Sequence, residues 1–160
     1  MKIIKFIPMT IFIWALVGCE SNPLIGFDSG EKGTYFKRLS IRCVAGKSPL
    51  VDLDSVSLSL EQVQPGSVLT HIITIERCVN DEERTASGPA IKVTRQIVVG
   101  VETAATNTED LSSQINRNGL WEVRTQINIG KNPPGRYAIR TTVYAGGRKL
   151  VRINPFTVVR

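Results

Sequence analysis

Alternation of hydrophobic and polar residues is the feature that most constrains how this chain can fold. From Tyr35 onward hydrophobic side chains recur at every second position, with polar ones between them. This period is typical of a strand with one buried face. Within 55–60, for example, Val56, Leu58 and Leu60 alternate with serines. Such alternation predicts strands in residues 36–44, 55–60, 68–79, 90–101, 120–129, 136–145 and 149–159.

Turn-forming residues separate these segments, among them Gln64-Pro65-Gly66, Ser87-Gly88-Pro89, residues 131–135 and Gly146-Gly147. About seven short strands with turns between them predict an all-β domain, a two-layer antiparallel sandwich. Its core requires no cofactor, because the apolar faces suffice. The residues predicted to face this core are Leu39, Ile41, Val56, Leu58, Leu60, Ile73, Ile75, Val93, Ile97, Trp121, Val123, Ile127, Tyr137, Ile139, Val143, Phe156 and Val158.

One segment, residues 107–115, has a helical character instead. Thr108 is a residue type that caps helices, and Glu109 and Asp110 would stand favourably in a first turn. The sequence predicts one short turn of helix here, or none.

The stretch Gly135-x-Tyr137-x-Ile139 resembles the tyrosine corner of immunoglobulin-like and fibronectin type III sandwiches. The resemblance implies that the Tyr137 hydroxyl bonds to backbone just before its strand. In true immunoglobulin domains a tryptophan lies between the two bridged cysteines, whereas Trp121 follows both Cys43 and Cys78. The resemblance therefore concerns architecture and implies no activity.

The first twenty residues read as a targeting segment. Lys2 and Lys5 are followed by the uncharged stretch 6–19, which is 14 residues long. A helix needs about 20 apolar residues to cross a bilayer, so a permanent span is the weaker interpretation.

Leu16-Val17-Gly18-Cys19 resembles the lipobox at which bacterial lipoproteins are cleaved before a lipid-bearing cysteine. The resemblance implies that residues 1–18 are a signal peptide that is removed and that Cys19 carries the lipid. The alternatives are an ordinary secretory signal or an uncleaved anchor. Residues 19–33 then form a flexible tether, and 34–160 form the sandwich domain. In a Gram-negative host, Glu20 after the cysteine implies export to the outer membrane; we expect the periplasmic face, with exposure at the cell surface as the alternative.

With Cys19 lipidated, Cys43 and Cys78 remain. An exported chain meets an oxidising compartment, so we expect these two to form a disulfide; two separately buried thiols are the alternative. Neither cysteine has a second thiol nearby, and His71 is the single histidine. No metal site is therefore expected.

Charge is distributed unevenly along the chain. Residues 117–160 hold nine Lys or Arg against one acid, a net of +8, whereas residues 19–116 hold nine against thirteen, a net of −4. A basic face in the C-terminal third is therefore expected. A three-residue loop at Gly146-Gly147 would bring Arg140 and Arg152 together beside Tyr144; a two-residue loop would move Arg152 to the opposite side.

Three uses of this face compete: a solvated surface, docking of a protein partner, and contact with a polyanion such as an envelope glycan or lipid phosphate. Arginine and tyrosine are typical anchors of protein interfaces. Nucleic acid is disfavoured, because no stacking platform accompanies the charges. The candidate binding residues are Arg140, Tyr144, Arg148, Lys149 and Arg152. Pairing with a second copy through the edge strand 149–159 is a further option.

An enzyme is the least supported class. His71 lies within an apolar strand, which favours a packed histidine over a catalytic one. The sequence holds no Gly-rich phosphate loop, HExxH or calcium-loop pattern. We therefore expect no catalytic residues and no cofactor. The expected function is binding, as an accessory or structural subunit of an envelope assembly, with a glycan-, lipid- or polyanion-binding module as the alternative.

Overall fold

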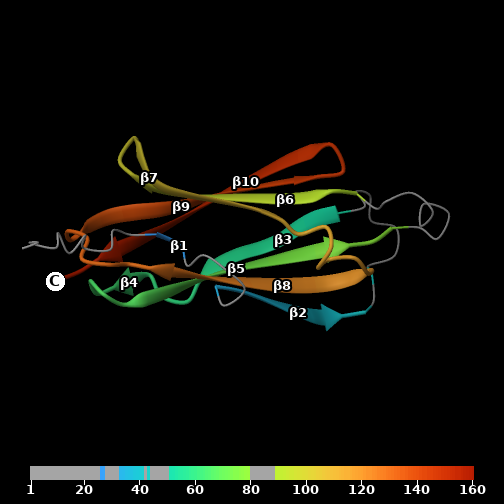
Figure 1. Cartoon of the computed structure of the whole chain (residues 1–160), viewed down its shortest axis with the longest axis horizontal. Helices are drawn as coiled ribbons and strands as arrows, with labels where there is room; N and C mark the ends of the chain where they lie inside the picture. Colours follow the sequence, from blue (N-terminus) through green and yellow to red (C-terminus); the bar gives the residue numbers. More distant parts are fainter. Residues whose placement is uncertain (1–25, 28–32, 42, 44–50, 80–88) are drawn as a thin grey trace, which may run out of the picture.

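The computed structural model describes residues 26–27, 33–41, 43, 51–79 and 89–160, and these form an all-β sandwich (Figure 1). Two five-stranded sheets pack face to face. In the first sheet the order is β1-β8-β5-β3, with β2 also paired to β8; in the second it is β4-β10-β9-β6-β7. The strands are β1 (Gly26–Phe27), β2 (Thr34–Ser40), β3 (Val51–Leu58), β4 (Gln62–Val63), β5 (Val68–Arg77), β6 (Ile91–Val99), β7 (Glu102–Asp110), β8 (Gly119–Asn128), β9 (Gly135–Ala145) and β10 (Arg148–Val158).

All seven predicted strands are present, as β2, β3, β5, β6, β8, β9 and β10. Pairing is antiparallel except where β4 joins β10 in parallel at Thr157 and Val158. The inward side chains of both sheets build the interior, as the alternation predicted. Fourteen predicted core residues are buried or partly buried, namely Val56, Leu58, Ile73, Ile75, Val93, Ile97, Trp121, Val123, Ile127, Tyr137, Ile139, Val143, Phe156 and Val158.

Strand β2 has the opposite phase from the one predicted. Leu39 is 46% exposed and Ile41 is 73% exposed, so neither belongs to the core. Phe36 instead packs against the core, and because sides alternate, Arg38 shares its face. Arg38 lies over the Trp121 ring, 5.9 Å from its centroid, and donates a hydrogen bond to the carbonyl of Asn118. These contacts hold the guanidinium in place on the inner face, although its Nε is buried without a hydrogen-bond partner among the described residues.

Leu60 is the third predicted core residue found at the surface, with 52% exposure. Strand β3 ends at Leu58, before Leu60 is reached. A register shift between Leu53 and Ser55 also changes the phase of β3. Because of that irregularity, Val51 and Leu53 before the shift and Val56 after it all contact the same core.

The predicted helical turn did not form at Thr108, which lies in strand β7 opposite Thr94 of β6. A single turn follows the strand instead: the Ile115 N–H donates to the Leu111 carbonyl at 2.8 Å. Asp110 stabilises this turn by accepting a hydrogen bond from the Ser112 N–H at 2.9 Å. The Leu111 carbonyl and the Asp110 carboxylate thus fix the chain just after β7 ends.

Two tight hairpins lie at opposite ends of the second sheet (Figure 1). Gly146 and Gly147 join β9 to β10 with φ of 54° and 76°, and Ala145 pairs directly with Arg148. Two positive φ values are the requirement of a type I′ turn, which glycines meet without strain. Gly100 and Val101 join β6 to β7 in an equally short loop, with Val99 paired to Glu102, but there only Gly100 has a positive φ, of 60°. Both loops are two residues long.

Two further predictions concern the disulfide and the tether that precedes the domain. Cys43 and Cys78 form a disulfide, as expected, with their Cα atoms 5.6 Å apart. Gly26 and Phe27, which lie within the predicted tether 19–33, pair with Asn128 and Ile127 of β8. Phe27 also packs against the core, and this apolar contact explains why the pair is ordered. The lipidation site Cys19 and the cleavage site before it lie outside the described residues.

Candidate functional site

The candidate site is a hollow beside the β9–β10 turn, with a volume of about 510 Å³. Tyr144, Arg148 and Lys149, three of the predicted binding residues, line it together with Lys92 of β6. Ala90, Ala145 and the turn glycines complete the wall. We call Lys92, Tyr144, Arg148 and Lys149 the hairpin surface.

Strand register positions the hairpin surface. Tyr144 lies directly opposite Lys149 on one side and Lys92 on the other, so three strands contribute to one row. The Lys149 ammonium lies 5.8 Å from the centroid of the Tyr144 ring, within the range of a cation–π contact. An exposed aromatic ring is therefore flanked by positive charge on both sides.

Lys92 has an acidic neighbour in the same row, Asp110 of β7. Hydrogen bonds from Ser112 hold the pKa of the Asp110 carboxyl below its ordinary value, and the charge of Lys92 lowers it to a smaller extent. Asp110 is therefore ionised at neutral pH and offsets part of the charge of Lys92. Arg148 and Lys149 supply the remaining positive charge of the hairpin surface.

The other two predicted binding residues do not join the hollow. Arg140 points outward on β9 but pairs with Ile153, four residues before Tyr144. Arg152 pairs with Thr141, whose side chain is buried, and so lies on the opposite side of the sheet from Arg140 and Tyr144. The loop is two residues long, so of the two alternatives that the sequence left open, the one that separates Arg152 from Arg140 is found.

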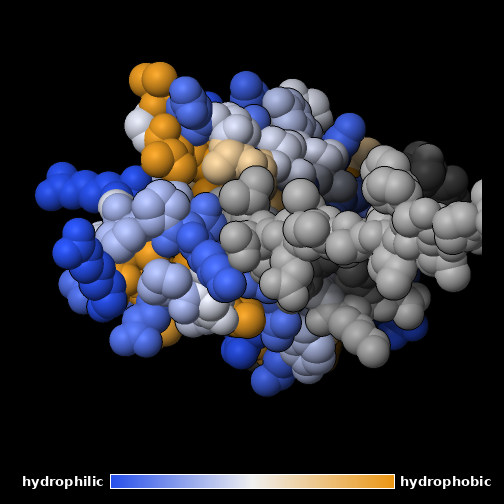
Figure 2. All heavy atoms as spheres, turned by 60° about the vertical axis from the view of Figure 1, so that its left-hand side comes forward, coloured by the Kyte–Doolittle hydropathy of each residue, from blue (hydrophilic) through white to orange (hydrophobic). Residues whose placement is uncertain are grey.

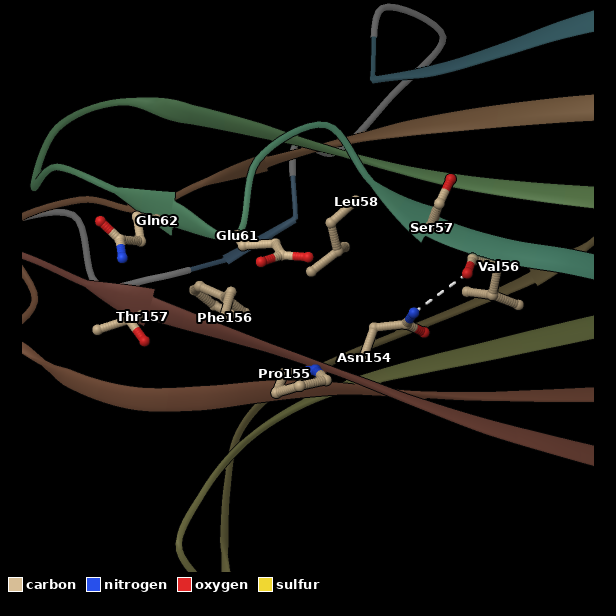
Figure 3. A pocket seen from close by; sticks show the side chains of 9 residues that line it. All are labelled: Val56, Ser57, Leu58, Glu61, Gln62, Asn154, Pro155, Phe156 and Thr157. Atoms are coloured by element: carbon tan, nitrogen blue, oxygen red, sulfur yellow. Dashed lines mark hydrogen bonds between the residues drawn. The ribbon is translucent and has the colours of Figure 1, made fainter.

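A second opening lies where the edge of β3 meets the edge of β10, with a volume of about 440 Å³. Figure 3 shows Leu58 and Glu61 on one side of this groove and Phe156 on the other. The Asn154 side-chain amide crosses the groove and donates to the Val56 carbonyl at 3.1 Å (Figure 3). This bond joins the free edges of the two sheets, so the groove is first of all a seam of the sandwich.

A group of polar side chains, which we call the polar belt, crosses the interior between the sheets. Arg95 is fully buried and pairs with Glu109, with 2.7 Å between Nη1 and Oε2. Nη1 also donates to Asn107 at 3.1 Å, and Nε donates to Nδ1 of His71 at 3.3 Å. His71 in turn contacts Thr141, with 2.9 Å between Nε2 and Oγ1. Four strands thus contribute to one network.

His71 is fixed as a neutral ring within this belt. Burial, and to a lesser extent the charge of Arg95, lowers the pKa of His71 to about 3. Because Nδ1 accepts from Arg95, the proton resides on Nε2 and is donated to Thr141. Both ring nitrogens are occupied and the residue is fully buried, so His71 cannot serve as an exposed general base.

Sequence reasoning missed Lys92 and the polar belt. Lys92 occupies an outward position of a predicted strand, and its position beside Tyr144 depends on a strand order that sequence alone does not reveal. Arg95 occupies an inward position of the same strand, where a charge breaks the apolar pattern. A lone arginine on a core face signals a buried partner.

Neither a metal centre nor a membrane span emerges from the described residues. In residues 26–27, 33–41, 43, 51–79 and 89–160, no group of three or more His, Cys, Asp or Glu could hold a metal ion. The same ranges include no helix that is long and apolar enough to cross a membrane.

The fold defines the class of the chain as an all-β sandwich of two five-stranded sheets. No protein-family model and no curated protein matches the sequence. Among solved structures it is similar to an alkylpurine DNA glycosylase from Pseudomonas fluorescens, with 18% identity, a TM-score of 0.44, and coverage of 69% of this chain and 31% of the other.

Two glycosidases are also similar. The match to a β-glucosidase from Listeria innocua has 16% identity and a TM-score of 0.39 and covers 79% of this chain and 16% of the other. The match to a family 123 glycoside hydrolase from Clostridium perfringens has 11% identity and a TM-score of 0.39 and covers 70% and 28%. The chain spans less than a third of each of these three proteins. Likenesses at this level assign no activity to it.

Proposed function

We propose that this protein is a lipid-anchored cell-envelope protein that acts by binding, as an accessory or structural subunit of a protein assembly at the outer membrane. Leu16-Val17-Gly18-Cys19, preceded by a basic start and an uncharged stretch, supports cleavage and lipidation at Cys19. The disulfide between Cys43 and Cys78 is consistent with an oxidising compartment such as the periplasm.

Within this proposal the domain is immunoglobulin-like. The Tyr137 hydroxyl donates to the Pro133 carbonyl at 2.8 Å, four residues upstream, which is the bond that a tyrosine corner makes. Pro133 belongs to the loop that leads into β9, so the bond fixes the entry of that strand. This bond supports a similarity in fold to immunoglobulin-like domains, and it does not indicate which ligand the protein binds.

The single observation that carries the binding role is the composition of the hairpin surface. Tyr144 and Arg148 are residue types that dominate the energetics of protein interfaces, and here they share a hollow with two lysines. The surface occupies the end of the second sheet, where a partner can approach it. An acidic patch with an apolar or aromatic centre is the complementary partner.

The second candidate is a module that binds an anionic envelope glycan or lipid phosphate. The observation that favours it is that Lys92, Arg148 and Lys149 bring three cations to one hollow. Phosphate and carboxylate groups are the natural ligands of such a cluster. Tyr144 would then contact the sugar ring or the acyl portion of the ligand.

The test is a double charge reversal, Arg148→Glu with Lys149→Glu, in the native lipoprotein. Cells are briefly cross-linked, the protein is extracted in mild detergent, and the material that co-purifies is identified by mass spectrometry. We expect one protein in near-equal amount with the wild type and at least about a tenfold loss with the variant, since interface arginines are hot spots. Retained glycan or lipid in place of a protein would transfer the proposal to the second candidate.

Arg152→Glu provides the matched control, because it reverses a positive charge of the same strand that lies outside the hollow. We expect this variant to retain the partner at the wild-type level. If the double variant also retains everything that the wild type retains, the hairpin surface is merely solvated and the binding proposal is wrong.

The anchor has its own test. Cys19→Ala removes the thiol to which the lipid would be attached, and we expect the precursor to stay uncleaved and unlipidated. Metabolic labelling with a fatty acid and the mass of the product measure this. Normal processing of the variant would contradict the anchor.

A further inference from the structure

The β6–β7 turn exposes hydrophobic side chains at the opposite end of the sandwich from the hairpin surface. Val101 is fully exposed and Val99 is 38% exposed, and they flank Gly100 at the tip. Figure 2 looks toward the end that carries this turn and shows hydrophobic side chains gathered at its upper edge. These two valines, one on each side of the turn glycine, belong to neither core cluster of their own domain.

The same end of the sandwich is where the chain arrives from Cys19. Gly26 of β1 pairs with Asn128, at the last position of β8, and Figure 1 shows β1 toward the end that carries the β6–β7 turn. Six residues, 20–25, separate Cys19 from Gly26. Seven steps along a fully extended chain span at most about 25 Å. A lipid on Cys19 therefore keeps this end of the domain close to the bilayer.

Exposed positive charge accompanies the valines. Arg136 is exposed on β9, two positions before Ala138, which pairs with Val98 beside the turn. Lys131 is exposed in the loop between β8 and β9, at the same end of the strands. Basic residues near anionic headgroups are attracted to a membrane surface.

We infer that the β6–β7 turn rests on the membrane that carries the anchor, with Val99 and Val101 at the boundary between headgroups and acyl chains. The inference depends on the proposed lipidation of Cys19 and adds an orientation to it. The long axis of the sandwich then points away from the bilayer, and the hairpin surface lies at the distal end. Two valines are too small an apolar area to bind a membrane alone, so the turn orients a domain that the lipid has already attached.

The test compares tryptophans at the two ends. Val101→Trp and Tyr144→Trp are made separately in the full, lipidated chain. Trp121→Phe is added to each to remove the fluorescence of Trp121. If Trp121→Phe does not fold, the fluorescence of the wild-type protein is subtracted instead. Each protein is reconstituted in vesicles of brominated phosphatidylcholine and phosphatidylglycerol, because bromine quenches nearby indole. We expect quenching at position 101 to exceed quenching at position 144 about twofold or more, since only the former would enter the interface.

Equal quenching at the two positions, or stronger quenching at 144, overturns the inference. The anchor is assessed in the same samples by sedimentation with the vesicles. A chain that sediments but is not quenched at 101 contradicts the orientation alone, whereas a wild-type chain that fails to sediment contradicts the proposed function itself.

A second measurement avoids introducing tryptophan, which itself favours interfaces. A membrane-impermeant amine reagent is applied to the lipidated wild type on vesicles, and the labelling of Lys131 is compared with that of Lys149. We expect Lys131 to be labelled several-fold less, relative to the detergent-solubilised protein, and Val99→Ser with Val101→Ser to restore it. Unchanged labelling of Lys131 in both proteins would indicate that the valines face water or a protein partner instead of lipid.

Discussion

The middle of the sandwich and its two ends hold the sheets together by different means. Toward each end the interior is apolar: one cluster includes Ile73, Ile91 and Val143, and the other includes Ile127 and Ile139. Between them the polar belt of His71, Arg95, Asn107, Glu109 and Thr141 spans the core. Apolar packing tolerates many arrangements of similar volume, whereas a buried arginine requires partners at fixed positions. The belt therefore specifies which strands face one another.

The largest effect is expected for Glu109→Ala, which tests the polar belt. This variant leaves the Arg95 guanidinium buried without its carboxylate partner. We expect the free energy of unfolding in urea at pH 7 to fall by about 4 kcal/mol, because removing one partner of a buried ion pair leaves an uncompensated charge. Glu102→Ala, an exposed acid on the same strand, is the control and should change stability by about 0.5 kcal/mol or less. Equal losses in both variants would show that Arg95 does not depend on Glu109.

Ile139→Ala tests the apolar end in the same way. Its side chain is fully buried in the second cluster, so we expect a loss of about 3 kcal/mol from lost burial and the cavity left behind. Ile153→Ala on the neighbouring strand is the control, because Ile153 is exposed and its truncation leaves no cavity. The two variants are compared by urea unfolding. A cost for Ile139 close to that of Ile153 would show that the cluster is loosely packed.

The belt also predicts a pH dependence that the apolar ends lack. The pKa of His71 is about 3 when folded and about 6.5 when unfolded, so the unfolded chain binds more protons below pH 6.5. Stability is thus fully present above pH 6.5 and is lost as the pH falls toward 3. We expect a loss of about 1 kcal/mol between pH 6.5 and 5.5.

His71 is the single histidine of the chain, which makes this interval informative. Urea unfolding of the wild type and of His71→Gln at both pH values measures the effect. The variant is less stable overall, but its stability should be nearly flat across the interval. A slope that persists in His71→Gln would assign the pH dependence to another group.

The smallest expected effect concerns a single polar group at the edge of the second cluster. Tyr137→Phe removes the hydroxyl that donates to the Pro133 carbonyl and leaves the ring, which stacks on Phe156 with centroids 5.5 Å apart. We expect a loss of about 0.5 kcal/mol in thermal or urea unfolding, because Pro133 is exposed and water can replace the donor. A loss as large as that of Ile139→Ala would mean that the bond from Tyr137 to Pro133 controls the whole loop.

Sequence reasoning succeeded where apolar residues face the core and failed where polar ones do. Strand β7 was missed because its inward positions hold Ala105, Asn107 and Glu109, and two of these bond to Arg95. No alternation of hydrophobicity reveals such a strand. The phase of β2 was misjudged for a related reason, since Arg38 is on the inner face while Leu39 and Ile41 are outside.

The candidate site was predicted in part. Tyr144, Arg148 and Lys149 line one hollow, because neighbours across one hairpin are close in sequence. The side of Arg152 could not be predicted, because one residue of loop length reverses the side of every later residue in the strand. Lys92 comes from a strand more than fifty positions earlier, and its place beside Tyr144 follows from the strand order β9-β6.

Strand β1 has a consequence for how far the domain can travel from the bilayer. Only the pairs Gly26–Asn128 and Phe27–Ile127 attach it to β8, so it is the most easily detached strand of its sheet under a pulling force. If β1 is peeled away, the leash of the proposed anchor runs from Cys19 to Gly33 instead of to Gly26, and its greatest extension doubles from about 25 Å to about 50 Å. The sandwich stays folded throughout, because β2 remains paired with β8. Detachment of the two-residue strand β1 would therefore give the proposed linker a second, longer reach.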